Sequence, residues 1–191
     1  LISDSRSISF NEAKYIVDDV IRLLTDNQVR PGDRILACSE NGFFMPLIAL
    51  ACSKMRATII PISPSLQSEQ IKNVLRVAKP NIVVSSRKAN AKLNEALDRE
   101  FNQKTLHIVF NSSHDFETHC VFGEKELITN DNNPSLDYNT PYTFIMNFTS
   151  GSTGDPKPVL ISEAAKICRL KDGTIKLFSL NEHDRILITT P

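Results

Sequence analysis

The feature that most constrains the fold is an alternation between short apolar runs and longer segments whose apolar residues recur every three or four positions. The short runs are typical of buried strands, and the longer segments of amphipathic helices. Strands that alternate with helices favour right-handed crossovers and a mostly parallel sheet. The predicted class is therefore α/β, with helices on both faces of the sheet. We expect strands at 34–38, 58–62, 82–85, 105–110, 142–148 and 186–189, and helices at about 10–27, from 41 onward, around 71–78 and 93–101, and at 163–178.

Several local signals set the expected boundaries. Ser9 and Glu12 have the spacing of a capping box at a helix start. The Pro31-Gly32-Asp33 sequence predicts a turn, because proline presets one dihedral angle and glycine supplies a left-handed one. Asn41 is the predicted N-cap of the second helix. Pro61 interrupts the second strand and predicts a sheet edge or a strand end.

The C-terminal helix predicted at 163–178 carries an apolar series that we expect to be buried. Its members are Ile167, Leu170, Thr174, Leu177 and Phe178. In contrast, the stretch from 111 to 141 is rich in Asn, Ser, Asp and His and predicts a long surface excursion.

Composition excludes some functions. Lys and Arg total 22 and Asp and Glu total 22, so no excess charge favours nucleic acid or an anionic membrane. No apolar run approaches the length of a membrane span. The four cysteines form no CxxC pair, which favours a reduced, cytoplasmic protein with Cys38 and Cys52 buried. The chain starts with Leu1 and stops at Pro191, at the end of a predicted strand, so we expect it to be part of a longer protein.

The loop after the 142–148 strand concentrates groups that bind phosphate. Its four hydroxyls, two glycines and one lysine lie in the sequence Phe148-Thr149-Ser150-Gly151-Ser152-Thr153-Gly154-Asp155-Pro156-Lys157. Glycines let backbone N–H groups converge on an anion, hydroxyls donate further hydrogen bonds, and lysine adds a positive charge. It is not a Walker A loop, because Pro156 and Pro158 occupy positions that need Gly and Ser or Thr. The alternative is a solvated Ser/Gly turn with no ligand.

The string FTSGSTGDPK resembles the phosphate loop of the adenylate-forming superfamily, which includes acyl-CoA synthetases, adenylation domains of nonribosomal peptide synthetases and luciferase. Further stretches are similar to segments of that superfamily along nearly the whole chain outside 111–141: 9–12, 29–35, 57–64, 79–84 and 184–191. The resemblance implies that residues 1–191 are part of the large N-terminal domain, with the remainder of that domain and the C-terminal domain absent.

By resemblance, the complete protein joins a small-molecule carboxylic acid to AMP, releases pyrophosphate, and then passes the acyl group to coenzyme A or to the phosphopantetheine of a carrier protein. The cofactors implied are ATP and Mg²⁺. The residues implied to hold the β- and γ-phosphates are Thr149, Ser150, Gly151, Ser152, Thr153, Gly154 and Lys157. The catalytic and acid-binding residues are expected after Pro191, so the 191 residues alone are expected to be inactive.

Three positions depart from the superfamily pattern: Pro158 and Arg56 replace glycines, and Glu163 replaces a frequent histidine. Proline cannot adopt a positive φ, so Pro158 predicts a different exit from the loop. One alternative is therefore a non-catalytic relative that binds a nucleotide or a partner, and another is a flavodoxin-like module whose loop match is accidental. His114, His119 and Cys120 lack zinc-site spacing, and no metal site is predicted.

Overall fold

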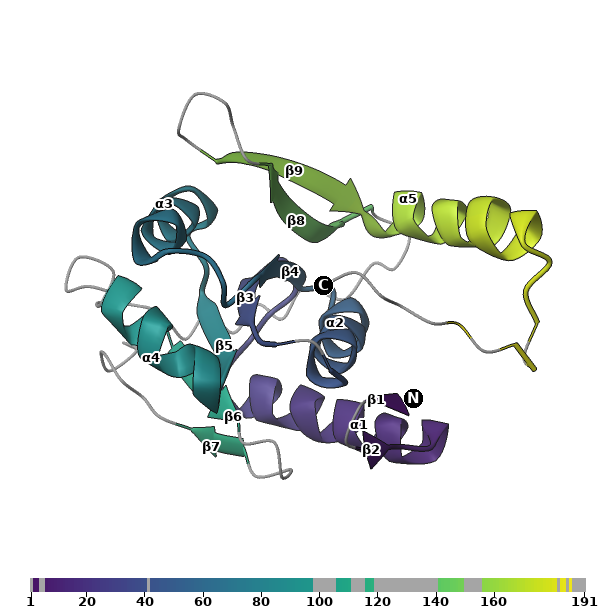
Figure 1. Cartoon of the computed structure of the whole chain (residues 1–191), viewed down its shortest axis with the longest axis horizontal. Helices are drawn as coiled ribbons and strands as arrows, with labels where there is room; N and C mark the ends of the chain where they lie inside the picture. The colour runs from purple at the N-terminus through teal and green to yellow at the C-terminus, as the bar shows by residue number, and fades with distance from the viewer. Residues whose placement is uncertain are drawn as a thin grey trace.

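The computed structural model describes residues 2–3, 6–40, 42–97, 106–110, 116–118, 141–149, 156–181, 183–184 and 186. One sheet dominates them, with the strand order β7-β6-β5-β3-β4-β8-β9 (Figure 1). Its strands are β3 (Arg34–Cys38), β4 (Thr58–Ile62), β5 (Ile82–Ser86), β6 (Leu106–Phe110), β7 (Phe116–Thr118), β8 (Thr143–Thr149) and β9 (Lys157–Ser162). Near the N-terminus, β1 (Ile2–Ser3) pairs separately with β2 (Arg6–Ser7).

The central part of the sheet is parallel, as the sequence predicts. Strands β6, β5, β3, β4 and β8 pair in parallel, and antiparallel β7 and β9 add to the two ends. The chain moves from β3 to β4 on one side, and then crosses β3 to form β5 on the other. This reversal of direction is the doubly wound arrangement, which places helices on both faces.

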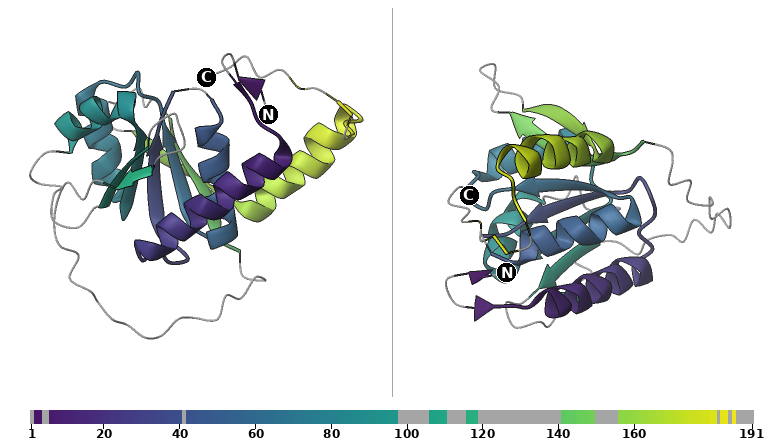
Figure 2. Two further views of the ribbon diagram at one scale, coloured as in Figure 1. Left: turned by 90° about the horizontal axis from the view of Figure 1, so that it is seen from below. Right: turned by 90° about the vertical axis from the view of Figure 1, so that its right-hand side faces the viewer.

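Two pairs of helices cover the two faces (Figure 2). Helices α1 (Phe10–Asp26) and α2 (Phe44–Met55) pack on one face, and α3 (Ser68–Ala78) and α4 (Arg87–Ala96) pack on the other. Successive residues of a strand point to opposite faces. Ile35 and Ala37 of β3 accordingly join the core under α1 and α2, whereas Leu36 and Cys38 join the core under α3 and α4. The predicted burial of Cys38 and Cys52 is confirmed.

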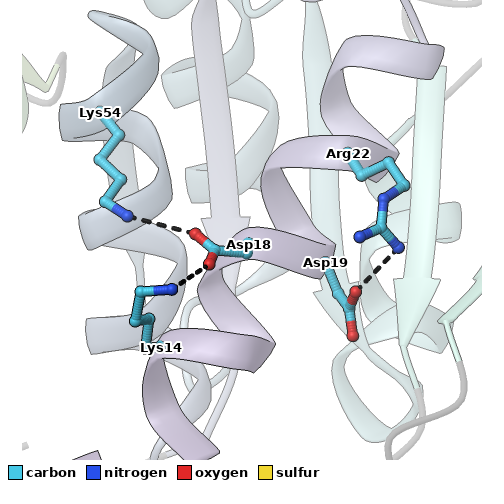
Figure 3. Close-up of polar contacts among 5 residues, drawn as sticks. All are labelled: Lys14, Asp18, Asp19, Arg22 and Lys54. Atoms are coloured by element: carbon cyan, nitrogen blue, oxygen red, sulfur yellow. Dashed lines mark hydrogen bonds and ion pairs between the residues drawn. The ribbon is translucent and has the colours of Figure 1, made fainter. Parts of the chain in front are cut away.

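The predicted capping box opens α1: the Glu12 amide donates to Ser9 Oγ, and the Ser9 amide donates to Glu12 Oε2. Further along this helix, Asp18 accepts from Lys14 at 3.1 Å and from Lys54 of α2 at 3.2 Å (Figure 3). These hydrogen bonds, that of Lys14 first, lower the pKa of Asp18. An ion pair in water contributes little, so the buried apolar contacts are the main link between α1 and α2.

The structure differs from the predictions for the start of α2 and for the position of Pro61 in β4. Helix α2 begins at Phe44, with Phe43 at the N-cap and no side-chain cap bond, and the predicted cap Asn41 lies outside the described residues. Pro61 lies in β4, which has neighbours on both sides, so the predicted edge is wrong. The predicted strand end is nearly correct, because Pro61 is the penultimate residue and β8 pairs with β4 only at Ile59. A missing N–H is tolerated there because no β8 partner is opposite it.

The largest corrections concern the chain after β8. Residues 157–162 form β9, which pairs with β8, where the sequence suggested only loop. The strand was missed because its apolar run is short and Pro158 lies beside it. The predicted C-terminal helix exists as α5 (Glu163–Cys168), continued by the π-helical segment η1 (Arg169–Ile175). Its predicted burial is wrong: Leu170 is 52%, Leu177 74% and Phe178 67% exposed, Ile167 is also exposed, and Thr174 is only partly buried.

Other expected elements fall partly or wholly outside the described residues. Of the predicted excursion at 111–141, residues 116–118 form β7 and Pro141 is exposed. Ile186 is in no strand, and 187–189 of the predicted last strand are outside the described residues. The same holds for Phe101 and Thr105.

Candidate nucleotide-binding hairpin

The two ends of the predicted phosphate loop lie opposite each other. Strand β8 ends at Thr149, β9 begins at Lys157, and these two residues are partners in the antiparallel register. Directly opposed residues in such a ladder have Cα atoms about 4.5–5.5 Å apart. The hairpin therefore brings together a hydroxyl and an ammonium group, both on exposed residues. Ser150, Gly151, Ser152, Thr153 and Gly154 lie outside the described residues.

The direction of β8 decides where this hairpin points. Strand β8 is parallel to β4, which is parallel to β3 and through it to β5. The carboxyl end of β8 therefore lies at the same edge of the sheet as the carboxyl ends of these central strands. Ligands of open α/β sheets bind at this edge. Thr149 and Lys157 therefore lie at the edge of the sheet where ligands of this class of fold bind.

At Pro158 the chain leaves the loop as an extended strand. It pairs with Phe148 in β9, and no described residue from 156 to 162 has a positive φ. Because β9 is the outer strand of the sheet, a residue without an N–H fits there. The exit that Pro158 requires is therefore a continuous strand that starts at Lys157.

Arg56 occupies the end of α2 in a left-handed conformation, with φ 55° and ψ 33°. This backbone explains why glycine is suited to the position, since a Cβ atom in that region costs roughly 1 kcal/mol or more. The side chain is nevertheless 8% exposed, and its guanidinium carbon lies 4.6 Å from the centre of the Tyr142 ring. A cation over an aromatic ring is attractive and offsets part of the backbone cost.

A polar cluster that the sequence did not reveal closes the other end of the hairpin. The Ser53 hydroxyl donates to Glu163 Oε1 at 2.8 Å, and the Tyr142 hydroxyl lies 3.1 Å from both Glu163 Oε1 and the Ser53 carbonyl oxygen. Burial, followed by the hydrogen bond to Glu163, raises the pKa of Tyr142, so its hydroxyl remains a donor at neutral pH. These residues are 21 to 110 positions apart in the chain, and no spacing pattern could have linked them.

No second site emerges from the described part of the chain. Within it, no group of three or more His, Cys, Asp or Glu residues could hold a metal ion. The candidates His114, His119 and Cys120 fall outside it. Burial raises the pKa of the Cys52 thiol to about 12, so this cysteine is a packing residue rather than a nucleophile. Among the described helices, none is long and apolar enough to cross a membrane.

Comparison with solved structures supports the same architecture. A protein from Rhodopseudomonas palustris assigned as a long-chain-fatty-acid CoA ligase is similar, with a TM-score of 0.74 and 18% sequence identity. The match covers 95% of this chain and 44% of that protein. At this identity the likeness establishes the fold: the N-terminal domain architecture of adenylate-forming enzymes.

The family follows from sequence comparison. The family of AMP-binding enzymes matches residues 1–191, and the chain belongs to it. Nonribosomal peptide synthetase ungA' of Aspergillus campestris is 28% identical over 158 residues, covering 81% of this chain and 2% of that protein. Enterobactin synthase component F of Escherichia coli O157:H7 is 25% identical over 171 residues, covering 88% of this chain and 12% of that protein. The chain thus spans a small part of these curated relatives.

Proposed function

We propose that this chain is part of an enzyme that uses ATP to activate a carboxylic acid as an acyl-adenylate, with release of pyrophosphate. The observation that carries the proposal is the β8–β9 hairpin, which ends in Thr149 opposite Lys157 at the carboxyl edge of the sheet. Membership of the AMP-binding enzyme family supports the same chemistry.

In this proposal the loop holds the β- and γ-phosphates. Its contributing residues are Thr149, Ser150, Gly151, Ser152, Thr153, Gly154 and Lys157. The ammonium of Lys157 and the hydroxyl of Thr149 suit phosphate oxygens, because both donate hydrogen bonds and one is a cation. Donors held in place before the reaction stabilise the charge that develops on the leaving pyrophosphate. Bound Mg²⁺ would neutralise phosphate charge, because it keeps several of its waters and prefers substrate phosphates as partners.

We further propose that residues 1–191 are one portion of the large domain of such an enzyme. The exposed apolar side chains of α5 and η1 support this, because single domains rarely leave such a series uncovered. The rest of the domain would cover them and supply the acid pocket and catalytic residues. The 191 residues alone would then catalyse no ATP–pyrophosphate exchange, and exchange by the isolated chain would contradict this point.

The proposal also includes transfer of the activated acyl group to a thiol. The acyl acceptor would be coenzyme A or the phosphopantetheine of a carrier protein, since the names of similar proteins include both a CoA ligase and peptide synthetases. The free state of Cys38, Cys52 and Cys168 fits the proposed cytoplasmic location.

The test is Lys157→Ala in the complete protein, measured by ATP–pyrophosphate exchange over a panel of carboxylic acids. We expect a loss of roughly 100-fold in kcat/KM for ATP, because one preorganised donor is removed. Lys166→Ala is the matched control, since Lys166 is an exposed lysine on α5 and outside the loop. Unchanged exchange in Lys157→Ala would remove the loop from the mechanism. ATP binding without exchange in the wild type would identify a non-catalytic relative.

A further inference from the structure

The hairpin that carries the loop has a short backbone register with the rest of the sheet. Strands β3 and β4 are paired along their whole length, from Arg34↔Thr58 to Cys38↔Ile62. By contrast, β8 is registered to β4 at the single pair Ile59↔Ile145. Strands β8 and β9 pair closely with each other from 143 to 149. The hairpin is therefore a stiff unit whose angle to the rest of the sheet is not fixed by a long ladder.

Side chains add to this attachment, through apolar packing of β8 on both cores and through polar contacts at the base of the hairpin. We name Ser53, Arg56, Tyr142 and Glu163 the hairpin latch. Glu163, the first residue of α5, accepts from Ser53 near the end of α2 and from Tyr142 just before β8. Arg56 covers the Tyr142 ring. The latch thus joins three segments: the end of α2, the start of β8 and the start of α5.

Backbone contacts at the same place reinforce the latch. The Thr58 hydroxyl of β4 donates to the Thr143 carbonyl oxygen at 2.6 Å. The Glu163 amide donates to the Tyr142 carbonyl oxygen at 3.3 Å, which holds the two ends of the hairpin base together. Only one proton is available on the Tyr142 hydroxyl, so it is shared between Glu163 and the Ser53 carbonyl oxygen. Each of these hydrogen bonds lies at the hairpin base, at the opposite end of β8 from Thr149.

The geometry makes the base a lever for the loop. Strand β8 runs from Thr143 at the latch to Thr149 at the loop. Six residue steps of strand span about 20 Å, so a pivot of about 3° at the base displaces the loop by about 1 Å. A misplacement of that size can cost roughly 100-fold in rate.

We propose that Glu163 and Tyr142 are positioning residues that set the location of the phosphate loop by fixing the base of the β8–β9 hairpin. The inference rests on the proposed function, because it assigns the purpose of the latch to ATP use. Both residues lie at the base of the hairpin, at the opposite end of β8 from Thr149, so their effect is transmitted through the two paired strands.

The test measures ATP–pyrophosphate exchange in the complete protein for three changes. Tyr142→Phe removes the hydroxyl and keeps the ring beside Arg56, Glu163→Ala removes the acceptor, and Glu163→Gln keeps an acceptor oxygen. For Tyr142→Phe and Glu163→Ala we expect kcat/KM for ATP to fall roughly tenfold while the KM for the carboxylic acid stays unchanged. Glu163→Gln should recover most of the activity lost in Glu163→Ala. A requirement for side-chain bulk alone would not explain a loss in Tyr142→Phe, because phenylalanine keeps the ring.

Glu95→Ala is the matched control, because Glu95 accepts from Ser68 at 3.0 Å in an exposed pair away from the hairpin. If Tyr142→Phe and Glu163→Ala behave like Glu95→Ala while Lys157→Ala is impaired, the positioning role is refuted and the proposed function stands. If Glu163→Ala does not fold, Tyr142→Phe decides by the same criterion.

Amide hydrogen exchange separates the two proposals. Faster exchange across 143–149 and 157–162 in Tyr142→Phe than in Glu95→Ala would support the latch. Equal exchange in both would overturn it. If the latch variants loosen the hairpin while Lys157→Ala leaves ATP use unchanged, the proposed function fails and the positioning role falls with it, leaving a structural tie.

Discussion

The two halves of the described structure differ in how they are held together. In the first, β3, β4 and β5 are packed between two pairs of helices, and apolar side chains fill both faces. In the second, β8, β9, α5 and η1 contribute Met146 as their only buried residue among those described from 141 to 186. The first half contains most of the buried core, whereas the second is attached to it through β4, the apolar side chains of β8 and the polar latch.

The contrast teaches that the candidate site and the stability of the fold reside in different places. The proposed phosphate loop is carried by the half with little core of its own. Its position therefore depends on the packing of β8 against the cores and on the polar contacts at the hairpin base. The predictions below test this division, from the largest expected effect to the smallest.

The first prediction compares one leucine from each half. Leu36→Ala removes a fully buried side chain of β3 and should lower the free energy of unfolding by about 2–5 kcal/mol. Leu170→Ala removes a side chain that is 52% exposed and should change it by less than about 0.5 kcal/mol in this chain. Urea denaturation measures both. A large cost for Leu170→Ala in this chain would erase the distinction between the halves, and a cost that appears only in the complete protein would sharpen it.

The second prediction concerns the joint between the halves at Arg56. Arg56→Gly and Arg56→Ala both remove the side chain over Tyr142, but only alanine keeps a Cβ in the left-handed conformation. We therefore expect the alanine variant to be less stable than the glycine variant by about 1 kcal/mol. Equal unfolding midpoints in urea would show that the end of α2 is not held in this conformation.

The third and smallest prediction is a pH dependence of the joint. Burial, then the Glu163 hydrogen bond, raises the pKa of Tyr142 above its usual value of 10.0. A raised pKa of an acid means that the folded state favours the protonated form, so this stabilisation is present below pH 10 and is lost as the pH rises through the folded value. Thermal melts from pH 8 to 11 should show a steeper loss in the wild type than in Tyr142→Phe. Identical profiles would show that the hydroxyl contributes nothing to the joint.

How much the sequence predicted varies along the chain. The strand at 34–38, the capping box at Ser9 and the turn at Gly32 were predicted correctly, because periodicity, capping and turn chemistry are local. Strand β9 was missed, because a strand that gains its partner from β8 needs no strong signal of its own. The burial expected for 163–178 was wrong. The spacing of apolar residues shows which helix face can be buried, but it does not show which segment buries that face.

By itself, the sequence determined the α/β class and the order of most elements, and it predicted a phosphate loop between Thr149 and Lys157. These follow from residues close together in the chain. Only the tertiary structure decided that β8 lies beside β4, that Lys157 faces Thr149 across an antiparallel ladder, and that Glu163 meets Ser53. Those contacts join residues up to 110 positions apart, and they form because the sheet order and helix packing bring their backbones together.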